Sequence, residues 1–295
     1  MNTHLSPLPV HTLANDHLRV DYLADAGPRL VRFSPAGSAV NLLADASDIS
    51  WETPYGPYHL YGGHRLWHAP EAFPRSYLPD NSGLQVEPLA DGVLLRQPVE
   101  AGSGIIKAMT LRLAADRAAL TVEHSLHNAG LWPVELAPWA ITQVALGGVT
   151  VLPFAAPAAS SYLPNRQLNF WPYTRLRDPR LHLDDDFVLV AGEVHEWVFK
   201  TGYFNHAGWM GYWLGELFFI KRWAPQSVLP QPDLGSNCEV FVWNRFLELE
   251  TLGALTRLEP GATATHCETW ELYPAPAAVC DIEAVRALVA TLGLA

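Results

Sequence analysis

A short segment near the C-terminus carries two carboxylates at a spacing that could do chemistry. Residues 246–252 read Phe-Leu-Glu-Leu-Glu-Thr-Leu, and this alternation of apolar and polar residues is typical of a half-buried strand. Side chains two apart on a strand point to the same face, so Glu248 and Glu250 point into one space. A carboxylate held rigidly in a concavity can serve as a general base. The pair therefore predicts either an acid–base enzyme or a sugar-binding site.

The densest group of polar and aromatic residues lies at residues 62–71, which read Gly-Gly-His-Arg-Leu-Trp-His-Ala-Pro-Glu. The planar guanidinium of Arg65 suits a carboxylate or the neighbouring hydroxyls of a sugar, and Glu248 is its natural partner. We expect a loop here that contacts a ligand through Arg65, Trp67 and His68.

The same segment raises the possibility of a metal site. His64 and His68 would face one way on a helix, with Glu71 about one turn further along. Pro70 argues against a helix that continues through this segment. We therefore expect no metal and no cofactor, although a metal-dependent sugar enzyme stays open as a third and weaker alternative.

Two further residues are expected to contact a ligand. Lys200 is one of three lysines and lies among the aromatic residues of segment 199–206. Its ammonium could bond a sugar hydroxyl or a carboxylate, and the alternative is a lysine whose stem covers apolar surface. Trp139 could form the floor of a sugar site, although a tryptophan more often belongs to a core.

The composition favours a folded protein that binds an amphipathic ligand. The chain contains 11 Trp, 10 Tyr and 11 Phe, and such rings have an apolar face and a polar edge that suit sugars, although a β-rich core would also use them. The net charge of −11 without a basic patch argues against nucleic acid and against anionic membranes as partners. We expect a carbohydrate or a sugar-derived small molecule instead. Nothing in the sequence indicates an oligomeric state.

The cysteines and the N-terminus predict a cytoplasmic location. Cys238, Cys267 and Cys280 are odd in number and have no CxxC spacing, so they are expected to be free, buried thiols in a reducing compartment. No basic and apolar leader is present, and no apolar run is long enough to span a membrane.

Short strands separated by turn residues fill most of the chain and favour an all-β sandwich or barrel in a single domain over residues 1–295. Segments 105–113 and 119–127 are expected to form a hairpin. One helix is expected at residues 282–292, with Asp281 as its cap and Gly293 after its end. Further strands are expected at residues 18–23, 29–33, 92–97, 139–146, 187–191, 208–214, 217–221, 238–243 and 263–272.

Four segments together resemble the aldose 1-epimerase (galactose mutarotase-like) superfamily, and an uncharacterised subgroup within it. They are Gly62–Glu71, His124–Trp139, Leu249–Leu252 (Leu-Glu-Thr-Leu), and Leu258–Gly261 leading to Thr269–Leu272. The resemblance covers nearly the whole chain, and the order and spacing of the segments carry it.

This resemblance implies a β-supersandwich, with two large and mostly antiparallel sheets, a short C-terminal helix and a concave sugar-binding face. It also implies a chemistry in which a Glu removes the anomeric proton while a His protonates the ring oxygen. Acid–base catalysis of this kind needs pKa values near the working pH. Glu250 falls on the Leu-Glu-Thr motif and is the candidate base.

The sequence departs from the family at the position of the His that serves as the general acid. The stretch that corresponds to the family's His-containing motif reads Ala-Pro-Trp-Ala-Ile-Thr-Gln at residues 137–143. His64 is the candidate substitute. The first hypothesis is therefore an aldose 1-epimerase-type enzyme, and the alternative is a non-catalytic carbohydrate-binding protein that keeps the fold without the acid.

Overall fold

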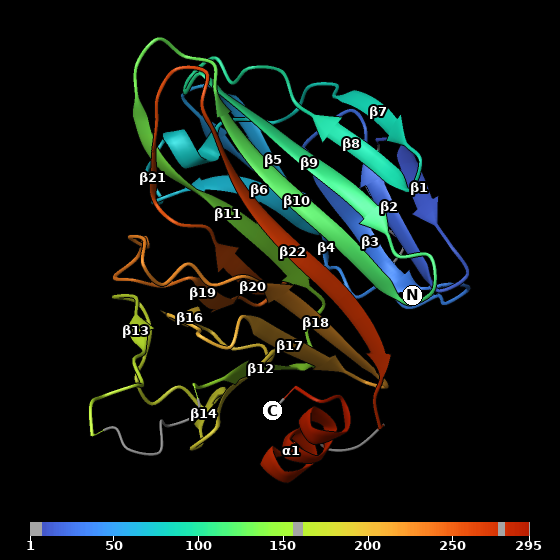
Figure 1. The fold of residues 1–295 in the computed structure, drawn as a ribbon, viewed down its shortest axis with the longest axis vertical. Helices are drawn as coiled ribbons and strands as arrows, with labels where there is room; N and C mark the ends of the chain where they lie inside the picture. The colour runs from blue at the N-terminus through green and yellow to red at the C-terminus, as the bar shows by residue number, and fades with distance from the viewer. Residues whose placement is uncertain (1–7, 156–161, 277–280, 295) are drawn as a thin grey trace.

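Two large antiparallel sheets stacked face to face form the body of the protein (Figure 1). The computed structural model describes residues 8–155, 162–276 and 281–294. Every strand pair among these residues is antiparallel, as expected where short connections join successive strands. The predicted two-layer β-sandwich is confirmed.

The first sheet holds the strands that carry the candidate site. Its order is β1-β2-β3-β6-β11-β20-β19-β16-β13, with β21 paired to β11. The strands are β1 (Val10–Ala14), β2 (Leu18–Leu23), β3 (Arg29–Pro35), β6 (His64–Ala69), β11 (Val134–Val144), β13 (Asn169–Phe170), β16 (Phe199–Tyr203), β19 (Cys238–Val242), β20 (Leu247–Leu252) and β21 (Thr256–Leu258).

The second sheet covers one face of the first. Its order is β14-β15-β12-β17-β18-β22-β10-β9-β8-β7. The strands are β7 (Gln85–Leu89), β8 (Gly92–Arg96), β9 (Ile105–Leu113), β10 (Ala119–Asn128), β12 (Val149–Pro153), β14 (Leu181–Leu183), β15 (Phe187–Ala191), β17 (Trp209–Leu214), β18 (Leu217–Trp223) and β22 (Thr263–Pro274). The expected hairpin is present as β9 and β10.

Two smaller elements lie outside the sheets. The hairpin of β4 (Asp45–Thr53) and β5 (Gly56–Gly62) packs on the face of the first sheet that points away from the second, which we call the outer face. A short 3-10 turn, η1 (Arg75–Tyr77), follows β6.

The main core lies between the sheets and follows from strand alternation. On β20, Leu247 and Leu249 point inward into this core, whereas Glu248 and Glu250 point to the outer face. Phe33 of the first sheet lies 5.2 Å, centroid to centroid, from both Phe219 and Trp270 of the second. Aromatic contacts of this kind join the two layers.

The C-terminal helix is confirmed and covers the far face of the second sheet. Helix α1 (Ile282–Thr291) begins with Asp281, whose carboxylate accepts a hydrogen bond from the Ala284 amide, and Gly293 follows with a φ of 63°. Its buried face packs against Trp209, Trp213 and Phe218. Within the described residues, no helix has the length and apolarity needed to cross a membrane.

The segment expected to be a ligand-binding loop is instead strand β6, between β3 and β11 in the middle of the first sheet. Both of its faces are buried, so the sequence shows no alternation of apolar and polar residues, and the loop expectation was wrong for this reason. Gly63, with a φ of 68°, enters the strand so closely that a Cβ atom would lie 1.9 Å from the Leu30 carbonyl oxygen.

The cysteines differ from expectation at one position. Cys238 is buried, but Cys267 is exposed because it occupies an outward position on β22. Cys280 lies outside the described residues.

Candidate functional site

A pocket on the outer face of the first sheet collects most of the residues expected to bind a ligand. Its volume is about 460 Å³. Its aromatic walls are Trp51, Trp67, Tyr77, Trp139, Tyr173, Phe241, Trp243 and Phe246. Its polar lining is Arg65, Glu71, Gln143, Lys200 and Glu248.

Strand register explains why these residues meet. On β20, Glu248 lies opposite Gln143 of β11, and Glu250 lies opposite Glu239 of β19. Arg65 of β6 reaches Glu248 across the intervening strand β11. Residues directly opposite one another on antiparallel strands share a face, so one row of polar groups crosses four strands.

Glu248 is the carboxylate that lines the pocket. Its Oε1 atom accepts hydrogen bonds from Arg65 Nη2 at 3.0 Å and from Gln143 Nε2 at 2.9 Å. The Arg65 guanidinium lies 4.6 Å from the centroid of the Trp67 ring. Burial raises the pKa of Glu248 above its usual range, and Arg65 opposes that rise. The side chain is 10% exposed, so this carboxylate is within reach of a ligand.

Glu250, the base implied by the family resemblance, lies beneath the pocket and has no exposed surface. Its Oε2 atom accepts hydrogen bonds from Trp139 Nε1 at 2.7 Å and from Lys200 Nζ at 2.9 Å. Lys200 Nζ also lies 2.8 Å from Glu239 Oε2. Glu250 therefore holds Lys200 and Trp139 in place and does not line the cavity.

In the buried group of Lys200, Glu239 and Glu250, two carboxyl groups face a single ammonium. The two carboxylates raise the pKa of Lys200 well above its usual range despite burial. Burial, together with the nearby Glu250, raises the pKa of Glu239 well above its usual range. Two carboxyl groups therefore share one ammonium in this buried space. The Lys200 ammonium also lies 4.9 Å from the Trp139 ring and 4.7 Å from the Trp171 ring.

His64, expected as the catalytic acid, does not reach this pocket. It neighbours Arg65 on β6 and so points to the opposite face, between the sheets, where it has no exposed surface. Its Nε2 atom lies 2.7 Å from His124 Nε2, and its Nδ1 atom lies 2.9 Å from Thr142 Oγ1. Burial lowers the pKa of His64 well below its usual range.

His68, expected to bind a ligand, also points between the sheets. Its Nε2 atom lies 3.1 Å from Glu100 Oε2, and its Nδ1 atom lies 2.8 Å from Arg75 Nη1. It does not line the pocket, whereas Glu71 does. The three residues of the metal alternative, His64, His68 and Glu71, therefore do not converge on one point.

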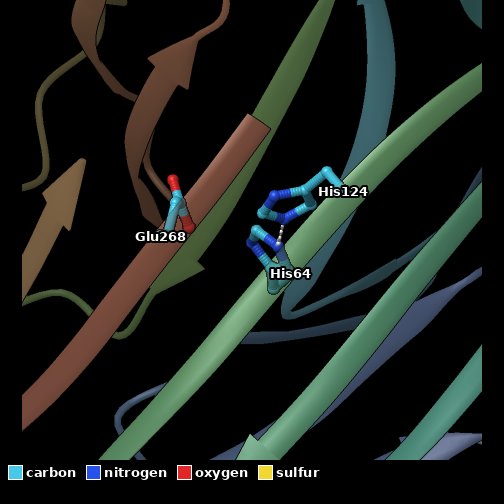
Figure 2. A group of neighbouring side chains, drawn as sticks. All are labelled: His64, His124 and Glu268. Carbon is cyan, nitrogen blue, oxygen red and sulfur yellow. Dashed lines mark hydrogen bonds between the residues drawn. The ribbon is translucent and has the colours of Figure 1, made fainter. Parts of the chain in front are cut away.

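A second group of possible metal ligands lies in the core, where ligand atoms of His64, His124 and Glu268 lie within 4.8 Å of one another (Figure 2). The oxygens of Glu268 are already bonded: Lys221 Nζ lies 2.9 Å from Oε1, and Trp270 Nε1 lies 2.7 Å from Oε2. Thr251 also donates to Oε1.

The histidines of this inter-sheet cluster complete a chain of hydrogen bonds without a metal. His124 Nδ1 must donate to the His266 carbonyl at 3.0 Å, so a neutral His124 accepts at Nε2 from His64. His64 Nδ1 then accepts from the Thr142 hydroxyl, which accepts in turn from Lys221 Nζ at 3.0 Å. These donors and acceptors are matched. His266 joins them through its Nε2 atom, which lies 2.8 Å from Thr251 Oγ1. The inter-sheet cluster therefore consists of His64, His124, His266, Glu268, Lys221, Thr142 and Thr251, and it is a structural polar cluster.

A larger hollow of about 700 Å³ lies beside α1. Its two arginines are paired: Arg222 lies 2.6 Å from Glu271, and Arg286 lies 2.7 Å from Asp184. Paired surface charges of this kind give no sign of a ligand.

Comparison with known proteins identifies the fold. No protein-family model matches this sequence, and no curated protein sequence matches it. A candidate aldose 1-epimerase from Escherichia coli K12 superposes with a TM-score of 0.54 at 16% identity, over 90% of this chain and 99% of that one. A galactose mutarotase-like protein from Lactobacillus casei ATCC 334 gives 0.53 at 12% identity, over 90% and 100%. The chain has the galactose mutarotase-like fold.

The mutarotase-like sandwich also occurs within a larger protein. A TPR-domain containing protein from Parabacteroides distasonis ATCC 8503 gives a TM-score of 0.63 at 12% identity, over 92% of this chain and 48% of that one. At such identities the similarity establishes the fold alone.

Sequence reasoning missed several residues of the site in this mutarotase-like sandwich. Glu239 was part of an expected strand, but its pairing with Glu250 depends on the register between β19 and β20, which the sequence does not show. Gln143 lies two residues along from Ile141, opposite Glu248, and only the pairing of β11 with β20 reveals it. The aromatic excess was the one available sign of Trp51, Trp243 and Tyr173.

Proposed function

We propose that the protein binds a carbohydrate in the pocket on the outer face of the first sheet. The observation that carries the proposal is the combination of aromatic walls with a buried row of polar groups, Arg65, Gln143 and Glu248. Aromatic rings pack on the apolar faces of a sugar, and a few fixed polar groups bind its hydroxyls. The volume of about 460 Å³ suits a ligand of one or two sugar rings.

Each polar group has a distinct part in this proposal. Glu248 accepts hydrogen bonds from sugar hydroxyls, because its Oε2 atom has no partner among the described residues. Lys200 lines the cavity and keeps one N–H for the ligand after its contacts with Glu239 and Glu250. Glu250 is a positioning residue for Lys200 and Trp139.

Acid–base ring opening of an aldose is the second candidate function, and the raised pKa of Glu248 favours it. A carboxylate whose pKa lies closer to neutrality is a better general base. Glu248 takes the role of base in this proposal because it lines the cavity, which Glu250 does not. A non-catalytic carbohydrate-binding protein is the alternative, and it needs no acid.

Binding is tested by isothermal titration of the purified protein with a panel of aldohexoses, aldopentoses and disaccharides. We expect saturable binding of at least one sugar, and a loss of affinity in Glu248→Ala but not in the exposed control Glu216→Ala. If no sugar binds the wild-type protein, the proposed function is wrong.

Catalysis is tested separately by NMR exchange between the two anomers of each sugar that binds. Exchange faster than in buffer, and lost in Glu248→Gln, supports the enzyme. Binding without faster exchange identifies the protein as a carbohydrate-binding protein without epimerase activity.

A further inference from the structure

The two cations that line the pocket are both already neutralised. Arg65 donates to Glu248 and lies over Trp67, and the Arg65 side chain is only 4% exposed. Lys200 lies between Glu239 and Glu250, at 2.8 Å and 2.9 Å, with its side chain 6% exposed. An anionic ligand would meet cations whose charge these carboxylates already balance. Two nitrogens of Arg65, Nε and Nη1, have no partner among the described residues, but both atoms are buried.

The carboxylates of the pocket are less completely used. Oε2 of Glu248 has no hydrogen-bond partner among the described residues, and the side chain is 10% exposed. Glu71 lines the pocket from an exposed position and accepts a hydrogen bond from the Tyr77 hydroxyl through Oε1 alone. Glu248 and Glu71 therefore each offer one carboxylate oxygen to a ligand, and such an oxygen accepts a hydrogen bond from a cationic group better than from an anionic one.

The charged groups in and beneath the cavity are mostly acidic. Arg65 and Lys200 face four carboxyl groups, those of Glu71, Glu248, Glu239 and Glu250. The carboxyl groups outnumber the cations two to one. A cleft with one sign of charge and apolar walls concentrates its field on the ligand and favours the opposite charge. Indole and phenol rings in the walls also attract a cation.

We propose that this pocket selects sugars by charge, binding an amino sugar more tightly than its neutral parent, and the neutral parent more tightly than the uronic acid or the phosphate ester. Glu248 is the specificity-determining residue, because its Oε2 atom, which has no partner among the described residues, is available to an ammonium group, and because its charge balances that of Arg65. This inference rests on the proposed function, since it names the class of sugar for the same pocket.

The wild-type protein alone tests the order. A matched series is titrated at low ionic strength and at a pH where the amine is protonated: a 2-amino-hexose, its N-acetyl derivative, the parent hexose, the corresponding uronate and the 6-phosphate. We expect the amino sugar to bind about tenfold more tightly than the parent, the scale of one charge interaction in a partly desolvated site. We expect the gain to shrink as salt is added.

The variant Glu248→Gln tests the residue, with Glu216→Gln as a control that removes one exposed charge far from the pocket. The expected result is loss of the amino-sugar preference and a gain for the uronate in Glu248→Gln, with the order unchanged in Glu216→Gln. Circular dichroism establishes that both variants are folded. The titrations of the wild-type protein test the order of affinities even if neither variant folds.

The outcomes separate the two proposals. If no sugar binds, the proposed function is wrong, and this inference, which depends on it, is wrong as well. If the neutral parent binds but the amino sugar gains nothing, or the uronate binds more tightly, the inference is wrong and the proposed function stands.

Discussion

The inter-sheet cluster and the polar groups of the pocket lie on opposite faces of the same strands, and they differ in how completely their hydrogen bonds are satisfied. Residues next to one another on β6, His64 and Arg65, belong to opposite regions, as do Glu250 and Thr251 on β20. The inter-sheet cluster matches donors to acceptors from Lys221 through Thr142 to the histidines. The pocket row, as we call the outer-face groups Arg65, Gln143, Glu248, Glu250, Glu239 and Lys200, leaves Oε2 of Glu248 without a partner among the described residues, beside a cavity.

This difference shows how similar residue types can serve stability in one place and binding in another. Buried polar groups that satisfy one another stabilise and specify a fold, and they cost stability when one partner is removed. Polar groups beside a cavity can exchange water for a ligand. The comparison therefore predicts that changes in the inter-sheet cluster affect unfolding, whereas changes in the pocket row affect binding.

The largest expected effect is a loss of stability in acid that arises from the inter-sheet cluster. Burial lowers the pKa of His64 and His124, and lowers that of His266 to about 3. Each histidine is therefore neutral in the folded protein but binds a proton below about pH 6.5 when unfolded. The stability that these neutral histidines contribute is present above about pH 6.5 and is lost as the pH falls towards each folded pKa. Between its unfolded and folded pKa, each histidine contributes a slope of at most about 1.4 kcal/mol per pH unit.

Urea unfolding followed between pH 7.5 and pH 4 measures this loss. His127→Gln, a change in a histidine on β10 outside the cluster, should leave the slope unchanged. A free energy of unfolding that stays level over this range would contradict the neutral histidine network.

The next largest effect is expected for Lys221→Met in the same cluster. The change leaves the Glu268 carboxylate buried without its cation, and breaking a buried pair in this way costs about 3–5 kcal/mol. The measurement is the urea midpoint at neutral pH. Sugar affinity of the folded variant should be unchanged, and a loss of affinity comparable to that of a pocket variant would break the comparison.

Lys200→Met makes the matching change in the pocket row. We expect a smaller loss of about 2 kcal/mol, because the carboxyl groups left behind can take up a proton beside a cavity. We also expect sugar binding to fail, since the variant lacks the N–H that Lys200 offers to the ligand. Calorimetry and urea unfolding of the two lysine variants, side by side, decide whether binding and stability separate as proposed.

The smallest effect is expected for Trp51→Ala in the pocket wall. Trp51 is only half-buried, and the ring lies 4.8 Å from that of Tyr58, so its removal should change stability little. Sugar affinity should fall about tenfold, which corresponds to about 1.4 kcal/mol. Retention of full affinity in titration calorimetry would place the sugar elsewhere in the cavity.

The sequence predicted the fold better than it predicted the site, and β20 and β6 show why. On β20 the alternation of apolar and polar residues is plain, so the shared face of Glu248 and Glu250 could be predicted. On β6 both faces are buried, and the pattern that identifies a strand disappears. Once a strand is known there, counting residues separates Arg65 and Trp67 from His64 and His68.

The positions of Glu239 and Glu250 in the site depend on contacts between residues far apart in the sequence, which a local sequence pattern cannot predict. Glu239 joins the site through the register of β19 against β20, and the enclosure of Glu250 depends on the side chains of Trp139 and Lys200 above it. The motif that resembles the family identified Glu250 on β20, and the packing around it determines that Glu248, two residues away on the same face, lines the cavity instead.

The aromatic walls have an optical consequence. Four of the 11 tryptophans, Trp51, Trp67, Trp139 and Trp243, line one cavity. Indole emission depends on the polarity of its surroundings, so a sugar that displaces water from these rings shifts the fluorescence of the whole protein towards the blue. The protein thus carries its own reporter of occupancy, and the unlabelled chain can be screened against a sugar library in a plate reader.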